Sequence, residues 1–152
     1  MKTNIQTHDA RRWNDMNRCV SIAQHARHPS DRWTVSEFAT FHRQPCSQGI
    51  TATIDGEIVG YALIEMECRK IHLHQLIVDP KYRGCGVGDR LIEAVVRKTV
   101  KGGPDVIVAE LRESDVAAQT FLQRFSGKWT ETMRGYYVDP VEDCYVMKMR
   151  IW

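Results

Sequence analysis

The sequence predicts a mixed α/β fold, and three observations support this prediction. Segments with strand character outnumber those with helical character. The stretch from Ile71 to Leu111 reads as strand, helix, strand, which requires two parallel strands joined by a right-handed crossover. The chain has 152 residues, a length typical of one domain that buries about 70% of its unfolded surface. We therefore expect a single domain over residues 1–152.

The first third of the chain carries helix signals after a short extended start around Asn4–Thr7. Asp9 can cap a helix that runs to about Gln24. Its apolar stripe is formed by four residues at helical spacing: Trp13, Met16, Val20 and Ala23. A second helix is expected to begin at Thr34–Glu37, because this segment has the Ser/Thr-x-x-Glu form of a capping box.

The middle of the chain changes to a period of two residues, which indicates strands. Ile50–Ile54 alternates, and Asp55-Gly56 then supplies the two-residue turn of a tight hairpin. The return strand is expected from Glu57 to about Cys68, and the next strand over Ile71–Val78.

The last part of the chain is expected to hold two helices and three strands. The first helix follows a glycine-rich loop and faces inward with five residues: Leu91, Ile92, Val95, Val96 and Thr99. Gly102-Gly103-Pro104 is a C-terminal stop signal. The remaining elements are a buried strand over Val106–Leu111, a helix capped by Ser114 or Asp115 that holds Phe121 and Leu122, and strands near Trp129–Val138 and Cys144–Ile151.

Composition excludes several classes of protein. The 21 basic and 19 acidic residues give a net charge of +2, and no basic run exceeds two residues, so nucleic acid is not an expected partner. No apolar run approaches the ~20 residues that span a bilayer. The first 13 residues lack the apolar stretch of a signal peptide, and the five cysteines have no zinc-binding spacing. We expect a cytoplasmic protein with free thiols, no metal and no membrane partner.

The most informative segment is Val78–Leu91, in which a strand leads into a glycine-rich loop and then a helix. Free amides at a helix start, together with the positive end of the helix, form an anion site suited to a pyrophosphate. A Walker loop would require Gly-Lys-Ser/Thr where this chain has Gly88-Asp89-Arg90, and a dinucleotide fingerprint would require a glycine at Asp89. The pattern that remains is Arg-x-x-Gly-x-Gly, on Arg83, Gly86 and Gly88. A glycine turn without a ligand is the alternative.

This pattern resembles motif A of the GNAT superfamily, the acyl-CoA-dependent N-acetyltransferases. Two later segments resemble the ribosomal-protein-alanine N-acetyltransferases of that superfamily. Ala109–Asp115 with Ala118 is similar to Leu-Glu-Val-Arg-x-Ser-Asn-x-x-Ala. Arg134–Tyr137, followed by Glu142-Asp143 and Met147, is similar to Arg-x-Tyr-Tyr…Glu-Asp…Met. Because Arg32-Trp33 also resembles the Pro-Trp of these enzymes, the resemblance spans nearly the whole chain.

The resemblance implies a GNAT fold, with a mixed central sheet of about six to seven strands flanked by about four helices. It implies an enzyme that transfers an acetyl group from acetyl-CoA to a primary amine by direct attack, with no metal, as a monomer or homodimer. The expected acceptor is a protein or peptide N-terminal α-amino group. A small amine or metabolite is an alternative acceptor, and a CoA-binding domain with weakened catalysis is an alternative function.

The resemblance also assigns the cofactor to the end of the fourth strand, the glycine loop and the start of a later helix. The residues concerned are Leu76, Ile77, Val78, Arg83, Gly84, Cys85, Gly86, Val87, Gly88, Asp89 and Asp115. The amide of Val78 is expected to polarise the thioester carbonyl, and the loop amides to bind the CoA pyrophosphate. We interpret Cys85 as a small residue of the loop, although a thiol at a helix start has a lowered pKa.

Glu110 is the first candidate for the general base. It matches the catalytic glutamate of the family, and it follows an otherwise apolar strand segment, Val106–Ala109. A structural carboxylate paired with Arg112 is the alternative. His72 is the second candidate, because related acetyltransferases place a base on this strand; a hydrogen-bonded strand histidine is the alternative for it.

One position departs from the family. The pattern Leu-Tyr-x-x-x-Gly-Phe places a tyrosine near the CoA sulfur, where it can protonate the thiolate, and this chain has Leu122 at that position. Tyr136 and Tyr137 carry hydroxyls that can substitute for the family tyrosine, and family members also use these two residues as walls of the peptide pocket. The alternative is that both are ordinary strand aromatics.

Overall fold

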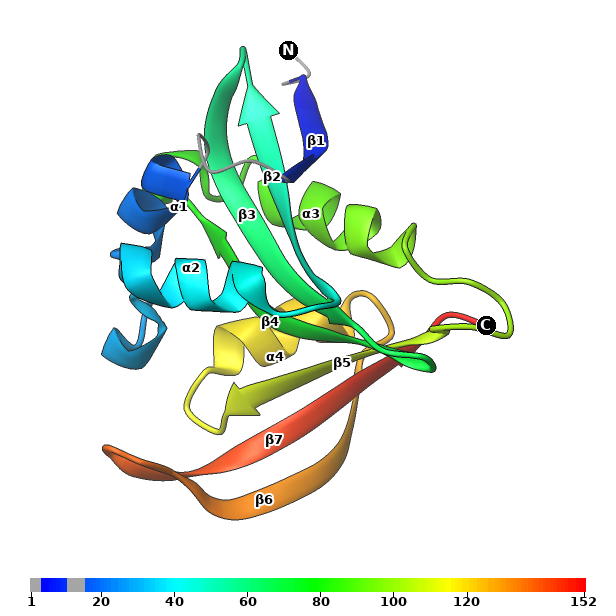
Figure 1. Cartoon of the computed structure of the whole chain (residues 1–152). Helices are drawn as coiled ribbons and strands as arrows, with labels where there is room; N and C mark the ends of the chain where they lie inside the picture. Colours follow the sequence, from blue (N-terminus) through cyan, green and yellow to red (C-terminus); the bar gives the residue numbers. More distant parts are fainter. Residues whose placement is uncertain (1–3, 11–15) are drawn as a thin grey trace. The chain divides into compact units, whose positions relative to one another are not determined.

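The computed structural model describes residues 4–10 and 16–152 of the chain (Figure 1). In these ranges seven strands form one mixed sheet in the order β1-β2-β3-β4-β5-β7-β6, together with four α-helices. The strands are β1 Ile5–Ala10, β2 Ser47–Ile54, β3 Glu57–Met66, β4 Lys70–Val78, β5 Val106–Arg112, β6 Lys128–Val138 and β7 Val141–Arg150. The helices are α1 Met16–Ala23, α2 Val35–Arg43, α3 Val87–Val96 and α4 Val116–Gln123. The predicted α/β class and the predicted numbers of strands and helices are confirmed.

The chain divides into two compact units, and each is described by itself. The first comprises Met1–Met66 and His74–Lys98, and the second comprises Glu67–Leu73 and Thr99–Trp152. Strand β4 therefore begins in the second unit and ends in the first. A single domain over residues 1–152 stays a prediction.

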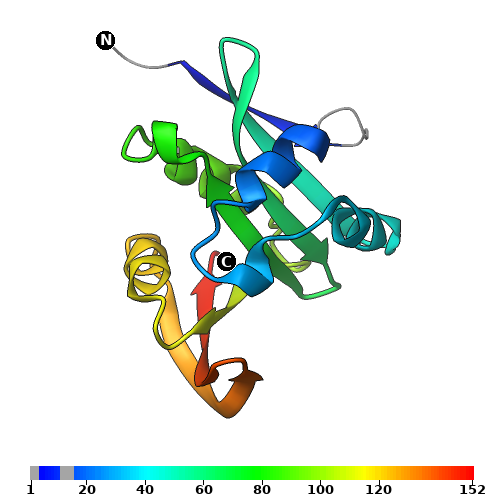
Figure 2. The same ribbon diagram turned by 90° about the vertical axis from the view of Figure 1, so that its left-hand side faces the viewer.

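The first unit is built around β1, β2 and β3, with helices on both faces of these strands (Figures 1 and 2). Tyr61 and Leu63 of β3 belong to a buried cluster that includes residues of α1 and α2. Gly60, which points the other way, contacts Val87 and Leu91 of α3, where a Cβ on this glycine would lie only 3.0 and 3.3 Å from their side chains. The alternation of β3 thus explains why α1 and α2 lie on one face and α3 on the other.

Two local predictions in the first unit are confirmed. Asp55 and Gly56 both have positive φ, 52° and 79°, as a two-residue hairpin turn of the primed type requires. The capping box of α2 is complete, because the Glu37 amide donates to Thr34 Oγ1 at 3.3 Å and the Thr34 amide donates to Glu37 Oε1 at 3.3 Å.

The predicted helix cap at Asp9 is wrong. Asp9 lies in β1, where it pairs with Ile50 of β2 and its Oδ2 accepts a hydrogen bond from Lys98 Nζ at 2.8 Å. Pairing along the whole of β1 outweighs a local cap signal, which contributes only about 1 kcal/mol. The described part of α1 spans Met16–Ala23, and Trp13, predicted for its apolar stripe, lies outside the described residues.

The second unit contains the parallel pair that the sequence predicts. Lys70–Leu73 of β4 pairs in parallel with Val106–Ala109 of β5, and β5 then pairs antiparallel with β7, which pairs antiparallel with β6. Helix α4 is capped by Asp115, whose Oδ1 accepts a hydrogen bond from the Ala118 amide at 3.2 Å. Strand β7 begins at Val141, earlier than the predicted Cys144.

Candidate active site

The glycine loop of the first unit is anchored by Asp79, directly after β4. The Asp79 amide donates to the Val59 carbonyl at 2.8 Å, and its carboxylate accepts from the Lys81 amide at 3.0 Å and pairs with Arg18. Burial alone would raise the pKa of Asp79, but the Lys81 amide and the Arg18 guanidinium outweigh it and hold this pKa below its ordinary value. The ionised carboxylate therefore fixes the start of the loop.

The loop leads into α3 with backbone amides that have no capping side chain. Gly84 and Gly86 have φ of 78° and 87°, which favours glycine. Gly86 is the N-cap of α3 and makes no side-chain hydrogen bond, and the first helical bond is donated by the Arg90 amide to the Gly86 carbonyl at 3.1 Å. A Cβ at Gly84 or Gly86 would meet nothing within 4 Å. The loop is open, and its geometry suits a phosphate group.

Arg83, the first residue of the motif, uses its side chain to join neighbouring segments of the first unit. Its Nε donates to the Val78 carbonyl at 3.3 Å, and its Nη2 donates to the His25 carbonyl at 3.3 Å. The guanidinium therefore stabilises the end of β4. Leu76, Ile77 and Val78 form this end and are half-buried.

In the second unit, the structure brings together three of the four predicted catalytic residues. Glu110 is half-buried on β5 opposite Val146 of β7. The charge of Glu110, then burial, then a hydrogen bond with Glu110 raise the pKa of the Tyr136 hydroxyl. Tyr137 packs edge-on against Tyr136, with ring centroids 5.1 Å apart. The Tyr136 hydroxyl is therefore hydrogen-bonded to the Glu110 carboxylate.

Tyr137 is fixed by two further side chains. Its hydroxyl donates to Cys144 Sγ at 3.9 Å, and the Arg112 guanidinium carbon lies 4.0 Å from its ring centroid. Burial and the neighbouring Cys144 raise the pKa of Tyr137, and burial raises that of the Cys144 thiol. Tyr137 is thus a neutral phenol already engaged with the protein.

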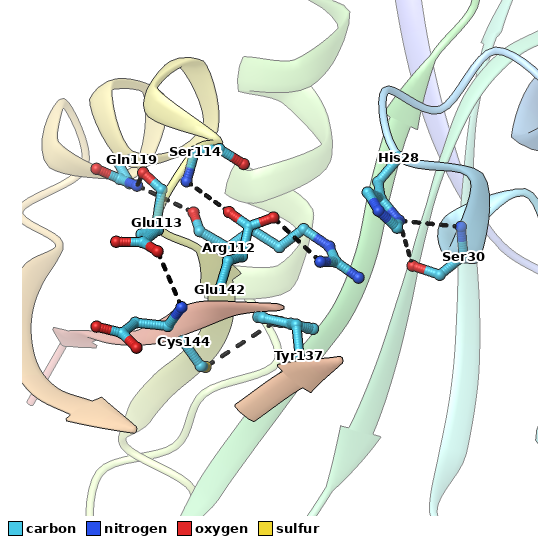
Figure 3. Close-up of polar contacts among 10 residues, drawn as sticks. His28, Ser30, Arg112, Glu113, Ser114, Gln119, Tyr137, Glu142 and Cys144 are labelled. Carbon is cyan, nitrogen blue, oxygen red and sulfur yellow. Dashed lines mark hydrogen bonds and ion pairs between the residues drawn. The ribbon is translucent and has the colours of Figure 1, made fainter. Parts of the chain in front are cut away.

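An ion pair between β5 and β7 lies next to Tyr137 (Figure 3). Arg112 Nη1 lies 3.1 Å from Glu142 Oε2, and the two side chains are only 10% and 8% exposed. Glu142 Oε1 also accepts from the Ser114 amide at 3.0 Å. Hydrogen bonds from Ser114 and then the Arg112 guanidinium hold the pKa of Glu142 below its ordinary value.

The pairing of Arg112 with Glu142 was not predicted from the sequence, which offered Glu110 as the partner of Arg112. The sequence did indicate that Arg112 lies near the candidate base, because Glu110 and Arg112 are two residues apart on one strand and so share a face. The pairing with Glu142 depends on the β5–β7 register, which no local pattern supplies.

The other predicted site residues lie as follows. His72 is half-buried on β4 opposite Val108, and therefore on the same face as Glu110, which is two residues after Val108. Asp115 caps α4 with its carboxylate. Leu122, at the position of the family tyrosine, is 3% exposed, so its side chain is part of the packing beneath α4.

Residues 4–10 and 16–152 can be searched for membrane-spanning helices, metal-ligand groups and disulfides. None of the helices there has the length and apolar character needed to span a bilayer. No three His, Cys, Asp or Glu side chains of these residues group as metal ligands would, and the absence of a metal stays a prediction. All five cysteines are free thiols.

Comparison with known proteins points to one family. The model of the acetyltransferase (GNAT) family matches residues 11–127. The N-alpha-acetyltransferase RimI of Mycobacterium tuberculosis is 28% identical over 138 residues, which cover 88% of this chain and 85% of that protein.

Solved structures share the fold. The ribosomal-protein-S18-alanine N-acetyltransferase of Escherichia coli has a TM-score of 0.84 at 23% identity, over 97% of this chain and 94% of that one. Naa50 of Arabidopsis thaliana, in complex with the bisubstrate analogue CoA-Ac-MVNAL, has a TM-score of 0.74 at 21% identity, over 95% and 97% of the two chains. The expected GNAT fold is confirmed, and the family match shows that this chain belongs to the acetyltransferase (GNAT) family of enzymes.

Proposed function

We propose that this enzyme transfers the acetyl group of acetyl-CoA to the N-terminal α-amino group of a protein or peptide, by direct attack and without a covalent intermediate. The observation that carries the proposal is the hydrogen bond between the Glu110 carboxylate of β5 and the Tyr136 hydroxyl of β6, two strands of the second unit that flank β7. The names of the M. tuberculosis and E. coli relatives, which act on N-terminal amines and on a ribosomal-protein alanine, support this choice of acceptor.

Acetyl-CoA is the co-substrate of this reaction. Its pyrophosphate binds the amides of Arg83–Gly88 and the first turn of α3, including Asp89, where the positive helix end favours an anion. Leu76, Ile77 and Val78 lie along the acyl and pantetheine part, with the Val78 amide at the thioester carbonyl, and Asp115 contacts the cofactor from α4. The open glycine loop and the CoA analogue bound to Naa50 support this assignment.

The reaction needs a neutral amine, a base and a proton for the leaving thiolate. Glu110 accepts a proton from the acceptor ammonium, and the freed nitrogen lone pair attacks the thioester carbonyl carbon. The nitrogen of the tetrahedral intermediate loses its second proton to water, and the intermediate collapses as the C–S bond breaks. The CoA thiolate takes a proton from the Tyr136 hydroxyl, which regains one from the protonated Glu110, or it takes a proton from water. Tyr136 suits this role better than Tyr137, because Tyr136 is 52% exposed, whereas Tyr137 is half-buried and its hydroxyl faces Cys144. His72 is the second candidate for the base.

The acceptor class follows from proton equilibria. An α-amino group has a pKa near 8, so roughly a tenth of it is neutral at pH 7, whereas a lysine with a pKa of about 10.4 is less than a thousandth neutral. One partly exposed carboxylate therefore assists an α-amine far more effectively than a lysine.

Leu122 favours a second candidate function, a CoA-binding domain with weakened catalysis. Its buried side chain offers no hydroxyl where the family has a tyrosine. In this case acetyl-CoA binds and the Glu110–Tyr136 contact is structural.

The test measures release of free CoA thiol from acetyl-CoA by the purified chain. Acceptors are an alanine-initiated peptide with a free N-terminus, the same peptide with a blocked N-terminus and an internal lysine, and a set of small amines. We expect turnover with the free N-terminus and little with the blocked peptide. Faster turnover with a small amine would show that the acceptor is a small amine and not a peptide N-terminus. Acetyl-CoA binding without turnover of any acceptor would favour the second function.

A further inference from the structure

Strand β6 carries a bulge directly before Tyr137. The register of β6 and β7 places Arg134–Tyr136 opposite Asp143 alone, with the shift between Met133 and Tyr137. Gly135, in the middle of this segment, has φ of 62°. A bulge turns side chains away from the regular alternation of a strand. Its shape therefore decides where the Tyr136 hydroxyl lies.

Asp143 holds this bulge from β7. A bulge leaves a backbone amide without its ladder partner, and such a group needs another acceptor. The Gly135 amide donates to Asp143 Oδ1 at 2.8 Å. The backbone of Asp143 is fixed in turn, because its amide donates to Glu113 Oε1 at 3.1 Å and its carbonyl accepts from the Glu113 amide at 3.1 Å.

Glu142 acts on the same segment through the opposite face of β7. Neighbouring residues of a strand point to opposite faces, and Glu142 pairs with Arg112 at 3.1 Å. The Arg112 guanidinium lies over the Tyr137 ring at 4.0 Å, and Tyr137 packs against Tyr136 at 5.1 Å. Asp143 thus holds the bulge directly, by a hydrogen bond to Gly135. Glu142 acts indirectly, because it pairs with the Arg112 guanidinium that stacks on the Tyr137 ring.

We propose that Glu142 and Asp143 are positioning residues, which fix the bulge of β6 so that the Tyr136 hydroxyl lies on the Glu110 carboxylate. The catalytic meaning of this arrangement rests on the proposed function, whereas the arrangement itself is testable without turnover. If the dipeptide only stabilises the fold, its loss lowers the unfolding temperature and leaves the Tyr136–Glu110 contact unchanged.

The first experiment compares steady-state kinetics of Asp143→Ala, Asp143→Asn and Lys148→Ala with the wild type. Lys148 is an exposed residue of the same strand and serves as the control. We expect Asp143→Ala to lower kcat about 10- to 100-fold, since a misplacement near 1 Å costs about that much, with KM for acetyl-CoA unchanged. Asp143→Asn keeps the Oδ1 acceptor and should restore most of kcat. Equal kcat values for Asp143→Ala and Lys148→Ala would overturn the proposal.

The second experiment needs no turnover. Ultraviolet titration of tyrosinate is recorded for the wild type, Asp143→Ala and Glu142→Gln, and subtraction of Tyr136→Phe in each background isolates Tyr136. Because Glu110 raises the pKa of Tyr136, this pKa should fall in both variants toward the ordinary value near 10. Glu142→Gln decides the question if Asp143→Ala fails to fold. An unchanged titration of Tyr136 in a folded variant overturns the proposal, even where the wild type acetylates no acceptor and the proposed function has failed.

Discussion

Glu110 and Glu142 are carboxylates of neighbouring strands with different partners. Glu142 is buried and receives hydrogen bonds from Ser114 and Arg112, which keep it ionised. Glu110 is half-buried and contacts the hydroxyl of Tyr136, a residue that is 52% exposed. A buried, fully bonded carboxylate is suited to hold a structure, whereas a carboxylate facing an accessible phenol can exchange a proton with a substrate.

Glu110→Gln should lower kcat by roughly 10- to 1000-fold at pH 7. This is the range expected when general-base assistance is lost and water partly replaces the base. Acetyl-CoA affinity should stay nearly unchanged, because the amide keeps the size of the side chain. The loss should shrink toward pH 9, where the acceptor amine is neutral without help. The pH dependence of kcat and of acetyl-CoA binding checks this, and wild-type activity at pH 7 would move the base to His72 or to water.

Asp79 gives a prediction on stability and pH. Its pKa is lower in the folded protein than its ordinary value, so the ionised group stabilises the fold at neutral pH, and this contribution disappears as the pH falls below about 4. Asp79→Asn should cost about 1–3 kcal/mol at pH 7, with a smaller difference at pH 3. Urea unfolding at both pH values measures it, with Asp55→Asn, in the exposed hairpin turn, as the control. A difference that is constant with pH would contradict the ion-pair assignment.

At the scale of elements, predictions held where a residue type has a steric or hydrogen-bonding reason for its place. Asp55-Gly56 makes the turn, and Thr34 and Glu37 make the capping box. The Asp9 cap failed because the pairing of β1 with β2 is a long-range event that no local window contains. The bulge in β6 escaped prediction for the same reason, since it exists only relative to the register of β7.

The candidate site was predictable to a similar extent. The glycine loop follows from its residues alone, because few motifs place glycines between a strand and a helix. Glu110 and the two tyrosines came from the family resemblance. The roles of Arg112 and Asp143 could not be predicted, because each depends on contacts between residues 8 to 30 positions apart that only the folded sheet creates.

The glycine loop is tested by a matched pair of substitutions. Gly86 and Gly102 both have positive φ, 87° and 80°, and a Cβ at either meets nothing within 4 Å. Gly86→Val and Gly102→Val should therefore lower the unliganded melting temperature similarly. The wild type should gain ~2.7 kcal/mol at acetyl-CoA concentrations of 100 Kd. Gly102→Val should keep this gain and Gly86→Val should lose it; an equal gain in both variants would refute the loop as the pyrophosphate site.

Ser126 occupies the position of the family glycine after α4, with φ of 65°. A non-glycine residue with positive φ costs roughly 1–2 kcal/mol. Glycine also makes the unfolded chain more flexible, which offsets part of the gain, so Ser126→Gly should stabilise the protein by about 1 kcal/mol. Chemical unfolding measures the change, and Ser36→Gly, within α2, should have the opposite sign because glycine weakens helices. A loss of stability in Ser126→Gly would show that the serine side chain contributes more than the backbone strain.

At the scale of the whole molecule, the residues that we assign to the reaction are divided between the two compact units. The first holds the glycine loop that we assign to acetyl-CoA, and the second holds Glu110, Tyr136 and the Glu142–Asp143 dipeptide that we assign to proton transfer and its geometry. Each unit has its own buried cluster, formed in the first by residues of α1, α2 and β3 and in the second by residues of β5 and β7. Substitutions at Gly86 of the first unit and at Glu110 of the second should therefore separate pyrophosphate binding from proton transfer.

The most direct measurement is tandem mass spectrometry of a single peptide that offers both a free N-terminal amine and an internal lysine, after incubation with the enzyme and acetyl-CoA at pH 7. We predict one added acetyl group, on the N-terminal nitrogen, in the wild type, and roughly 10- to 1000-fold less product with Glu110→Gln. Acetylation of the lysine instead, or no product although acetyl-CoA binds, would contradict the assignment of this enzyme to N-terminal amines.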